Sequence, residues 1–462
     1  MMNKKKLKQI LMDSDEVLSE EDELELKTWL SNKKKSIQKI EKCVADVGRF
    51  YDYNKLKKQG FTKEQIKVFN EKDNQIIDFA EKLVEQHKID HEYMFGYPTN
   101  MKKDSYVIRY LRYLESKLYF TNSCGNAYSQ GNYRMNNAKQ ELEIIERVKD
   151  NLGLSGEDFW GYITTGGTEG NMWGIREGFN NFPNGILYCS DAAHYSVTKM
   201  SDIIGKLKYE IIESVNEKIV VEKLIERIKN NYQKNNSPAI ILLTFGTTTL
   251  GSIDDIDSIC NIINKLNIPH YIHIDAALYG GIPSNQLDSP AEKFSMFNKT
   301  DINSISVSFH KYVGSQKTNG VLLSRSKAYN KFIDYIGNND VTFCGSRDFP
   351  TFSLLQRIEE LYDRTTFTEY IDKVKIFEKM LNDNQIHYDK GVESSNIFVI
   401  HKPSDDICKK YQLATFTRDR IDYAHVVIFP YHNVEVMNEL ISDLVYNKVS
   451  LNKKSKGDSN EE

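Results

Sequence analysis

The stretch GYITTGGTEGNMWG, residues 161–174, decides the fold class of this 462-residue chain. Its apolar start predicts a buried strand, and the residues from Asn171 onward predict a helix. The glycine-rich turn between them lets bare backbone N–H groups approach an anion, and the helix N-terminus adds the positive end of its dipole. Gly167, Thr168 and Glu169 are the candidate donors. The turn matches neither the P-loop nor the dinucleotide-binding pattern.

Apolar runs alternate with amphipathic helical stretches on both sides of this turn, from about residue 105 to 330. Several runs are apolar at almost every position, which is typical of strands covered on both faces. This alternation predicts an α/β domain with a mostly parallel sheet. The further strand candidates are ILYCS (186–190), AIILLTFGT (239–247), HYIHIDAA (270–277), SISVSFH (304–310) and GVLLS (320–324).

The regions outside this large α/β domain (105–330) have a different character. Residues 1–104 are rich in Lys and Glu with helical apolar spacing, so we expect a helical N-terminal segment. Residues 331–450 combine helical stretches with two strand candidates and predict a smaller α+β domain, whose last helix we expect at 434–446. The polar tail at 451–462 predicts disorder.

Composition argues against several classes of protein. The formal net charge of −4 gives no electrostatic basis for binding nucleic acid. No apolar run approaches the roughly 20 residues that span a bilayer, and the N-terminus lacks the pattern of a signal peptide. The 6 cysteines are scattered without a CxxC pair, which argues against disulfides and zinc. We expect a cytoplasmic protein without metal, nucleic acid or membrane partners.

Asp275, in HIDAALYGG (273–281), ends an apolar strand. A buried carboxylate there is costly unless a cation or donor meets it. It could pair with the protonated ring nitrogen of a pyridine cofactor and keep that ring an electron sink. It could equally cap the next turn. A metal site through His273 and Asp275 is a third option, although no third ligand is evident.

Lys311, in SVSFHKYVGS (306–315), ends another apolar strand. Burial would lower its pKa and leave an amine able to form an imine, whereas many lysines at strand ends reach out to water. The order of these residues favours the first interpretation. The glycine-rich turn, His194, Thr248, Asp275 and Lys311 each follow a successive strand, and ligands of open α/β sheets bind at that edge.

These motifs together resemble the group II decarboxylases of fold type I, which depend on pyridoxal 5'-phosphate (PLP). The branch they resemble most contains bacterial histidine decarboxylases and plant serine decarboxylases. The likeness runs from GYPTN (96–100) to AHVVIFPYHNVE (424–435). It is carried by GGTEGNMWG, LYCSDAAHYSVTK, GTTTLGSIDDI, HIDAALYGG, SVSFHKYVGS, TFCGSR and YQLAT.

The resemblance implies that Lys311 forms the Schiff base with PLP. It implies that Asp275 pairs with the pyridine nitrogen, Ala277 packs under the ring and His194 stacks on the opposite face. Thr248 would form a hydrogen bond near the ring.

The resemblance also assigns the phosphate and a partner subunit. Thr168, Ser308 and His310 would hold the phosphate, with backbone donors from Gly167 and Glu169. The segment at Gly345 and Ser346 would reach the cofactor of the partner in a homodimer with a shared active site. Tyr335 matches a loop tyrosine that returns a proton to Cα.

The expected reaction is the decarboxylation of a small L-amino acid, with histidine ahead of serine or an aromatic amino acid. Two alternatives stay open. One is another fold type I enzyme, an aminotransferase or carbon–sulfur lyase, in which Arg418 or Arg420 would clamp the substrate carboxylate. The other is an inactive PLP-binding homologue. Its basis is the segment GSRDFPTF (345–352), in which Asp348, Phe349 and Pro350 follow GSR in place of the usual Asn-Gly-His.

Overall fold

The computed structural model describes residues 57–58, 60–101, 122–134, 136–205, 207–284, 289–296, 301–315, 317–325, 331–340, 342–348 and 364–457. They belong to two units, which divide after Gln86. Helix α4 (Lys63–Glu92) begins with a capping box, since Thr62 and Gln65 each accept a backbone N–H of the other. The rest of the expected N-terminal helical segment lies largely outside the described residues.

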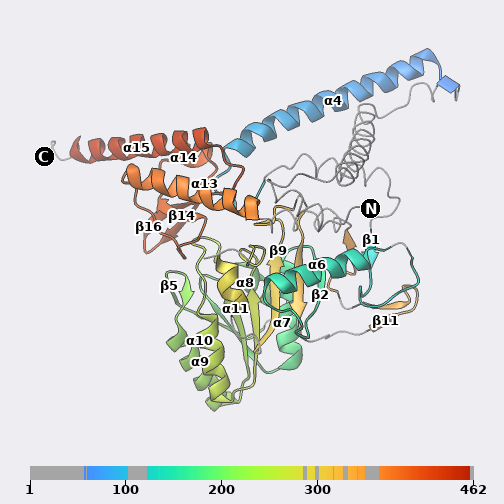
Figure 1. The fold of residues 1–462 in the computed structure, drawn as a ribbon, viewed down its shortest axis with the longest axis vertical. Helices are drawn as coiled ribbons and strands as arrows, with labels where there is room; N and C mark the ends of the chain where they lie inside the picture. Colours follow the sequence, from blue (N-terminus) through green and yellow to red (C-terminus); the bar gives the residue numbers. More distant parts are fainter. Residues whose placement is uncertain are drawn as a thin grey trace, which may run out of the picture. The chain divides into compact units, whose positions relative to one another are not determined.

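The second unit is built on a seven-stranded sheet in the order β2-β10-β9-β8-β7-β3-β4 (Figure 1). Only β10 is antiparallel to its neighbours, so the predicted mostly parallel α/β sheet is confirmed. The strands are β2 (Trp160–Thr164), β3 (Ile186–Ser190), β4 (Tyr209–Ile212), β7 (Ala239–Thr244), β8 (His270–Asp275), β9 (Ile302–Ser308) and β10 (Gly320–Ser324).

Helices follow the strands and cover them. Strands β2, β3, β7 and β10 are buried at every residue, as their continuous apolar runs predict. The helices of this region are α6 (Ala138–Asn151), α7 (Gly167–Asn181), α8 (Ser196–Ile204), α9 (Val221–Asn235), α10 (Ile256–Leu266) and α11 (Pro290–Met296). None of the helices in the described part of the chain has the length and apolarity that a membrane span requires.

Helix α7 packs across β8, β9 and β10 on a stripe of glycines. A methyl group on Gly170 would lie 2.5 Å from Ser306 Cβ, and one on Gly174 would lie 2.2 Å from His273 Nδ1. Gly167 and Gly178 face the same side of the helix and are equally crowded. The glycines therefore let the helix lie against the sheet with its N-terminus at the strand ends.

A smaller antiparallel sheet, in the order β14-β16-β15, follows in the chain. Its strands are β14 (Ile397–His401), β15 (Ala414–Arg418) and β16 (Ile421–Val427), and its helices are α13 (Arg364–Asp383), α14 (Asp405–Lys410) and α15 (Val434–Gly457). The last helix continues to Gly457, through the part of the tail expected to be disordered, because no proline or glycine interrupts it earlier.

The segment between the two sheets forms small pairings of its own. Strands β11 (Lys331–Ile333) and β12 (Asn338–Asp340) make a hairpin. Strand β13 (Ser346–Asp348) pairs with β1 (Asn122–Cys124), which precedes the large sheet. The expected domain bounds, 105–330 and 331–450, stay predictions. A further short hairpin, β5 (Ser214–Val215) with β6 (Lys218–Ile219), lies beyond β4.

Candidate active site

The loops after five strands carry the predicted site residues. Strand β2 leads into the glycine-rich turn, β3 to His194, β7 to Thr248, β8 to Asp275 and β9 to Lys311. These strands all run in one direction, since only β10 is reversed. The five loops therefore emerge at the same edge of the sheet, where open α/β folds bind their ligands.

The glycine-rich turn is braced by the side chain of Glu169. Its Oε2 accepts both the N–H and the hydroxyl of Thr165 at 2.7 Å, and its Oε1 accepts the hydroxyl of Tyr162 at 2.8 Å. Gly166, with φ 147°, makes the turn that starts α7. The carboxylate thus fixes the turn, while the backbone of Glu169 remains at the helix N-terminus.

Two backbone donors remain at this end of α7. The first four N–H groups of a helix have no intrahelical partner. Here the N–H of Gly167 donates to Ser308 Oγ at 2.9 Å, and that of Gly170 donates to the carbonyl of Gly166. The N–H groups of Thr168 and Glu169 are left for an anion, so Gly167 contributes its lack of a side chain rather than its donor.

Side chains from β8 and β9 close around the turn. A methyl group on Gly167 would lie 2.6 Å from Ser308 Oγ and 3.0 Å from Ala277 Cβ. One on Gly166 would lie 3.5 Å from His310 Cε1. Ser308 at the end of β9, His310 just after it and Ala277 just after β8 therefore meet at one helix N-terminus.

Asp275 is 4% exposed and accepts a hydrogen bond on each oxygen. Asn171 Nδ2 donates to Oδ2 at 2.7 Å, and the N–H of Ala277 donates to Oδ1 at 3.1 Å. The second bond is the turn cap that the sequence left open as an alternative. Each carboxylate oxygen has a further lone pair, so the cap does not prevent Asp275 from accepting a cationic N–H.

Lys311 and His194 lie within electrostatic reach of Asp275. Burial lowers the pKa of Lys311, and Asp275 partly opposes that shift. Burial, and to a smaller extent the charge of Lys311, lowers the pKa of His194, whereas the charge of Asp275 raises it. The N–H of Ser196 donates to His194 Nδ1 at 3.3 Å, so the proton of the neutral ring lies on Nε2. Burial, followed by Lys311, also lowers the pKa of His310.

Both ring nitrogens of His273 are hydrogen-bonded within the protein. Its Nε2 bonds Asn171 Oδ1 at 3.0 Å and its Nδ1 bonds Ser304 Oγ at 2.7 Å, so both ring nitrogens are engaged. Among the described residues, no three His, Cys, Asp or Glu side chains form a group that could hold a metal ion. The metal site considered for His273 and Asp275 is therefore not supported.

Comparison with known proteins gives the family. Residues 182–354 match the pyridoxal-dependent decarboxylase conserved domain. The chain is 32% identical over 385 residues to a histidine decarboxylase of Pseudomonas fluorescens, covering 79% of this chain and 89% of that protein. It is 30% identical over 364 residues to serine decarboxylase 2 of Oryza sativa subsp. japonica, covering 76% and 74%. The chain belongs to the pyridoxal-dependent decarboxylases.

Solved structures agree on the fold of this decarboxylase. L-methionine decarboxylase from Streptomyces sp. 590 superposes with a TM-score of 0.70 at 17% identity, covering 81% of this chain and 95% of that one. Sphingosine-1-phosphate lyase from Burkholderia pseudomallei K96243 superposes with a TM-score of 0.64 at 13% identity, covering 84% and 93%. The fold is therefore that of the fold type I PLP enzymes.

The decarboxylase is a carboxy-lyase with PLP as its cofactor, and its residues fit that group. A buried amine, a buried carboxylate and a helix N-terminus with two backbone donors are the partners that an aldehyde, a pyridine nitrogen and a phosphate require. Sequence reasoning missed the role of Asn171, although the residue stands in the decisive motif.

Other predicted residues of the decarboxylase lie on the segment between the two sheets. Tyr335 is 73% exposed in the turn of the β11–β12 hairpin, where Asn132 Nδ2 donates to its carbonyl at 3.4 Å. Gly345 has φ 70° and precedes β13, at the start of which Ser346 pairs with Cys124. Nearby, the N–H of Phe343 donates to the hydroxyl of Tyr162, which also binds Glu169. The segment thus docks on the glycine-rich turn.

Of the two arginines considered as carboxylate clamps, Arg418 is engaged elsewhere. Arg418 Nη2 pairs with Asp389 Oδ2 at 3.1 Å, and its guanidinium lies over the ring of Tyr423. Arg420, with φ 66°, occupies the turn between β15 and β16. Both belong to the β15–β16 hairpin of the small sheet, and Arg418 already has a carboxylate partner.

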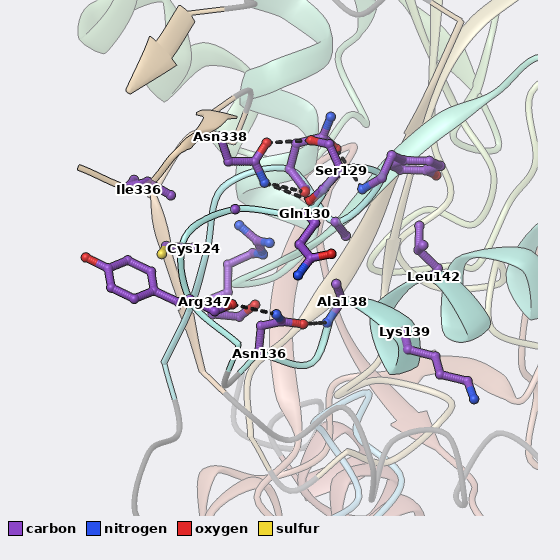
Figure 2. Close-up of a pocket in the computed structure, with 16 residues that line it drawn as sticks. Cys124, Ser129, Gln130, Asn136, Ala138, Lys139, Leu142, Ile336, Asn338 and Arg347 are labelled. Atoms are coloured by element: carbon purple, nitrogen blue, oxygen red, sulfur yellow. Dashed lines mark hydrogen bonds between the residues drawn. The ribbon is translucent and has the colours of Figure 1, made fainter. Parts of the chain in front are cut away.

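A pocket of about 400 Å³ lies beside the β11–β12 hairpin (Figure 2). Its walls come mainly from residues 123–142, and Ile336, Asn338 and Arg347 complete them. Arg347 is held by Glu141 Oε2 at 2.9 Å, and Asn338 is held by the backbone of Asn126 and Ser129. None of the predicted catalytic or cofactor-binding residues lines it. The pocket is thus separate from the cluster around Lys311.

Proposed function

We propose that this decarboxylase removes the α-carboxylate of L-histidine and releases the amine and carbon dioxide. Serine and the aromatic amino acids are the next candidates. Support comes from its relatives, since those that it matches at 29–32% identity are named histidine decarboxylase or serine decarboxylase.

The observation that carries the proposal is the convergence of Lys311, Asp275 and His194, whose charges influence one another across three loops. Lys311 supplies the amine that holds the cofactor covalently, since its lowered pKa favours the neutral, nucleophilic form. Asp275 accepts the N–H of the pyridine ring. When bound, PLP supplies the electron sink for the pair that the departing carboxylate leaves behind.

The remaining residues bind and orient the cofactor. The backbone donors of Thr168 and Glu169, with the side chains of Thr168, Ser308 and His310, hold the phosphate at the N-terminus of α7. The missing side chain of Gly167 makes room there, since a methyl group would collide with Ser308. Ala277 and His194 enclose the ring from opposite faces, and Thr248, in the loop after β7, forms a hydrogen bond at its edge.

The cofactor site is shared within a homodimer in this proposal. Gly345 and Ser346 reach the cofactor of the partner subunit, and Tyr335 returns a proton to Cα. Tyr335 lies on an exposed hairpin, which suits a group that meets a substrate from outside its own loop cluster. Mixing two inactive variants, Lys311→Ala and Ser346→Trp, would restore activity if the site is shared. Activity that stays absent in proven mixed dimers would exclude the sharing.

We place the enzyme in the cytoplasm. Among the described residues Cys124, Cys189, Cys260, Cys344 and Cys408 are all free thiols, as is usual in a reducing compartment.

The decisive experiment is product analysis. The purified holoenzyme is incubated with each of the twenty amino acids, and amine, carbon dioxide and keto acid are measured. Histamine and carbon dioxide from histidine would support the proposal. A keto acid without carbon dioxide would identify an aminotransferase or a carbon–sulfur lyase, and the pairing of Arg418 with Asp389 disfavours the aminotransferase. Full cofactor loading without any product would identify an inactive homologue. The altered GSRDFPTF segment is the only observation that favours this alternative.

A further inference from the structure

A chain of buried hydrogen bonds leads from the interior of the sheet to Asp275. Tyr271 OH donates to Ser304 Oγ at 2.9 Å, and Ser304 Oγ bonds His273 Nδ1 at 2.7 Å. His273 Nε2 bonds Asn171 Oδ1 at 3.0 Å, and Asn171 Nδ2 donates to Asp275 Oδ2 at 2.7 Å. We call these four links the relay.

The chemistry of the groups fixes the direction of the relay. A carboxylate only accepts hydrogen bonds, so Asn171 must turn its amide nitrogen to Asp275 and its oxygen to His273. The histidine then carries its proton on Nε2 and accepts the hydroxyl of Ser304 on Nδ1. Ser306 Oγ donates to the same amide oxygen and supports this orientation. Every donor in the relay therefore points toward Asp275.

The relay is dry and neutral. His273 and Ser304 are 0% exposed and Asn171 is 1% exposed. Burial lowers the pKa of His273 to about 4, so the ring carries no charge at neutral pH. The links polarise one another in such a low-dielectric interior, which strengthens the last bond to the carboxylate.

The fold makes room for the relay at some cost. Gly170 and Gly174 stand inside α7, where glycine is a poor helix former. A side chain on Gly174 would collide with the ring of His273, and one on Gly170 would collide with Ser306. Both glycines therefore accommodate the polar groups that surround Asn171.

We propose that Asn171 and His273 are positioning residues, which hold the Asp275 carboxylate in the one orientation that engages the pyridine nitrogen of the cofactor. The inference rests on the role given to Asp275 under Proposed function. The N–H of Ala277 fixes Oδ1 and the relay fixes Oδ2, so the carboxylate cannot rotate about its last bond without breaking a hydrogen bond.

The test compares two substitutions of His273 in the full-length protein. His273→Phe keeps the ring volume but removes both hydrogen bonds, whereas His273→Gln keeps a donor toward Asn171 and an acceptor toward Ser304. Asn396→Leu is the matched control, since Asn396 is 2% exposed and donates to the carbonyl of Ile428 in the small domain. The readouts are the dissociation constant of PLP, the visible absorption of the bound cofactor and the melting temperature of the apoprotein.

We expect His273→Phe to raise the PLP dissociation constant about tenfold and to shift the visible absorption, because the released Asn171 no longer holds its charged hydrogen bond to Asp275 in place. His273→Gln should restore most of the parental PLP affinity and most of the parental absorption spectrum. Asn396→Leu should lower the melting temperature but leave the PLP dissociation constant and the visible absorption unchanged. A His273→Phe protein with parental affinity and spectrum would overturn the inference. So would a His273→Gln protein no better than His273→Phe at equal melting temperature.

Two further variants separate the possible failures. If Asp275→Asn leaves PLP affinity unchanged, the proposed role of Asp275 itself is wrong. If Asp275→Asn loses the cofactor while His273→Phe keeps it, only the relay is wrong. Should neither His273 variant fold, Ser304→Ala cuts the relay one link earlier with little change in volume. It should raise the dissociation constant severalfold, and parental affinity would contradict the inference.

Discussion

The imidazole of His273 occupies the space that a side chain on Gly174 would need. A methyl group there would lie 2.2 Å from Nδ1 and 2.6 Å from Cε1 of the ring. Helix α7 and strand β8 meet at this point, so one contact sets both the distance of the helix from the sheet and the place of the ring that bonds Asn171. Packing and cofactor geometry are therefore coupled here.

Gly174→Ala should destabilise the protein, contrary to the usual effect of this change inside a helix. Helix propensity favours alanine by about 1 kcal/mol. Overpacking against the buried His273 ring should cost about 1–3 kcal/mol and displace the ring, so the balance turns unfavourable. Urea unfolding of the apoprotein measures the free energy. A variant at least as stable as the parent would show that the His273 ring can move to admit the methyl group without loss of stability.

Much of the large sheet could be predicted, because its strands are apolar at nearly every position. Within the seven-stranded and three-stranded sheets, the strands missed by that pattern are β4 of the large sheet and β15 of the small one, most of whose residues are exposed or half-buried. An edge strand needs no continuous apolar run, and nothing else in Tyr209–Ile212 or Ala414–Arg418 marks it.

The site could be predicted in part only. Strand order places Asp275 and Lys311 at one edge, but it does not give the partners of each side chain. The alternation along β8 placed His273 on the same face as Asp275, so the sequence alone still allowed a metal site at these two residues. The actual partner, Asn171, lies on α7, about a hundred residues earlier in the chain. Such a contact depends on helix packing, of which the glycine spacing 167, 170, 174 and 178 was the available signal.

Lys311→Ala should abolish the covalent attachment of the cofactor and lower kcat by at least about a thousandfold. The reason is that no other amine replaces the buried one. Borohydride reduction followed by peptide mapping checks the first effect, and product formation checks the second. Lys317→Ala, at an exposed position in the same loop, is the control and should keep both. Cofactor fixed to a different lysine in the parent would refute the assignment.

Tyr335→Phe should lower kcat about a hundredfold or more with little change in KM, if the phenol returns the proton to Cα. Cofactor loading should stay parental, because the residue is 73% exposed and lies outside the cluster around Lys311. Tyr446→Phe, at a tyrosine that is 76% exposed on α15, is the matched control. Parental kcat in Tyr335→Phe would assign the proton transfer to another group.

Stability should fall as the pH drops from about 7 to 5. Burial lowers the pKa of His273 and of His432 to about 4, well below that of an unfolded histidine at about 6.5. The unfolded chain therefore takes up protons first, and the contribution of each ring is complete above pH ~6.5, shrinks below it and is lost below about pH 4. Asp254 acts in the opposite sense, because burial raises its pKa to about 6.

The two histidines outweigh the single carboxyl, so the free energy of unfolding should be roughly 2 kcal/mol lower at pH 5 than at pH 7. His432 offers the cleaner test, since its ring accepts the N–H of Phe429 and bonds the carbonyl of Met94, away from the cofactor residues. His432→Gln, which does not titrate, should strongly reduce that pH dependence, because only the contribution of His273 then remains against that of Asp254. Denaturant unfolding at pH 7 and pH 5 measures the free energy of unfolding at each pH. An unchanged difference between the two values in the variant would show that His432 is already protonated in the folded state.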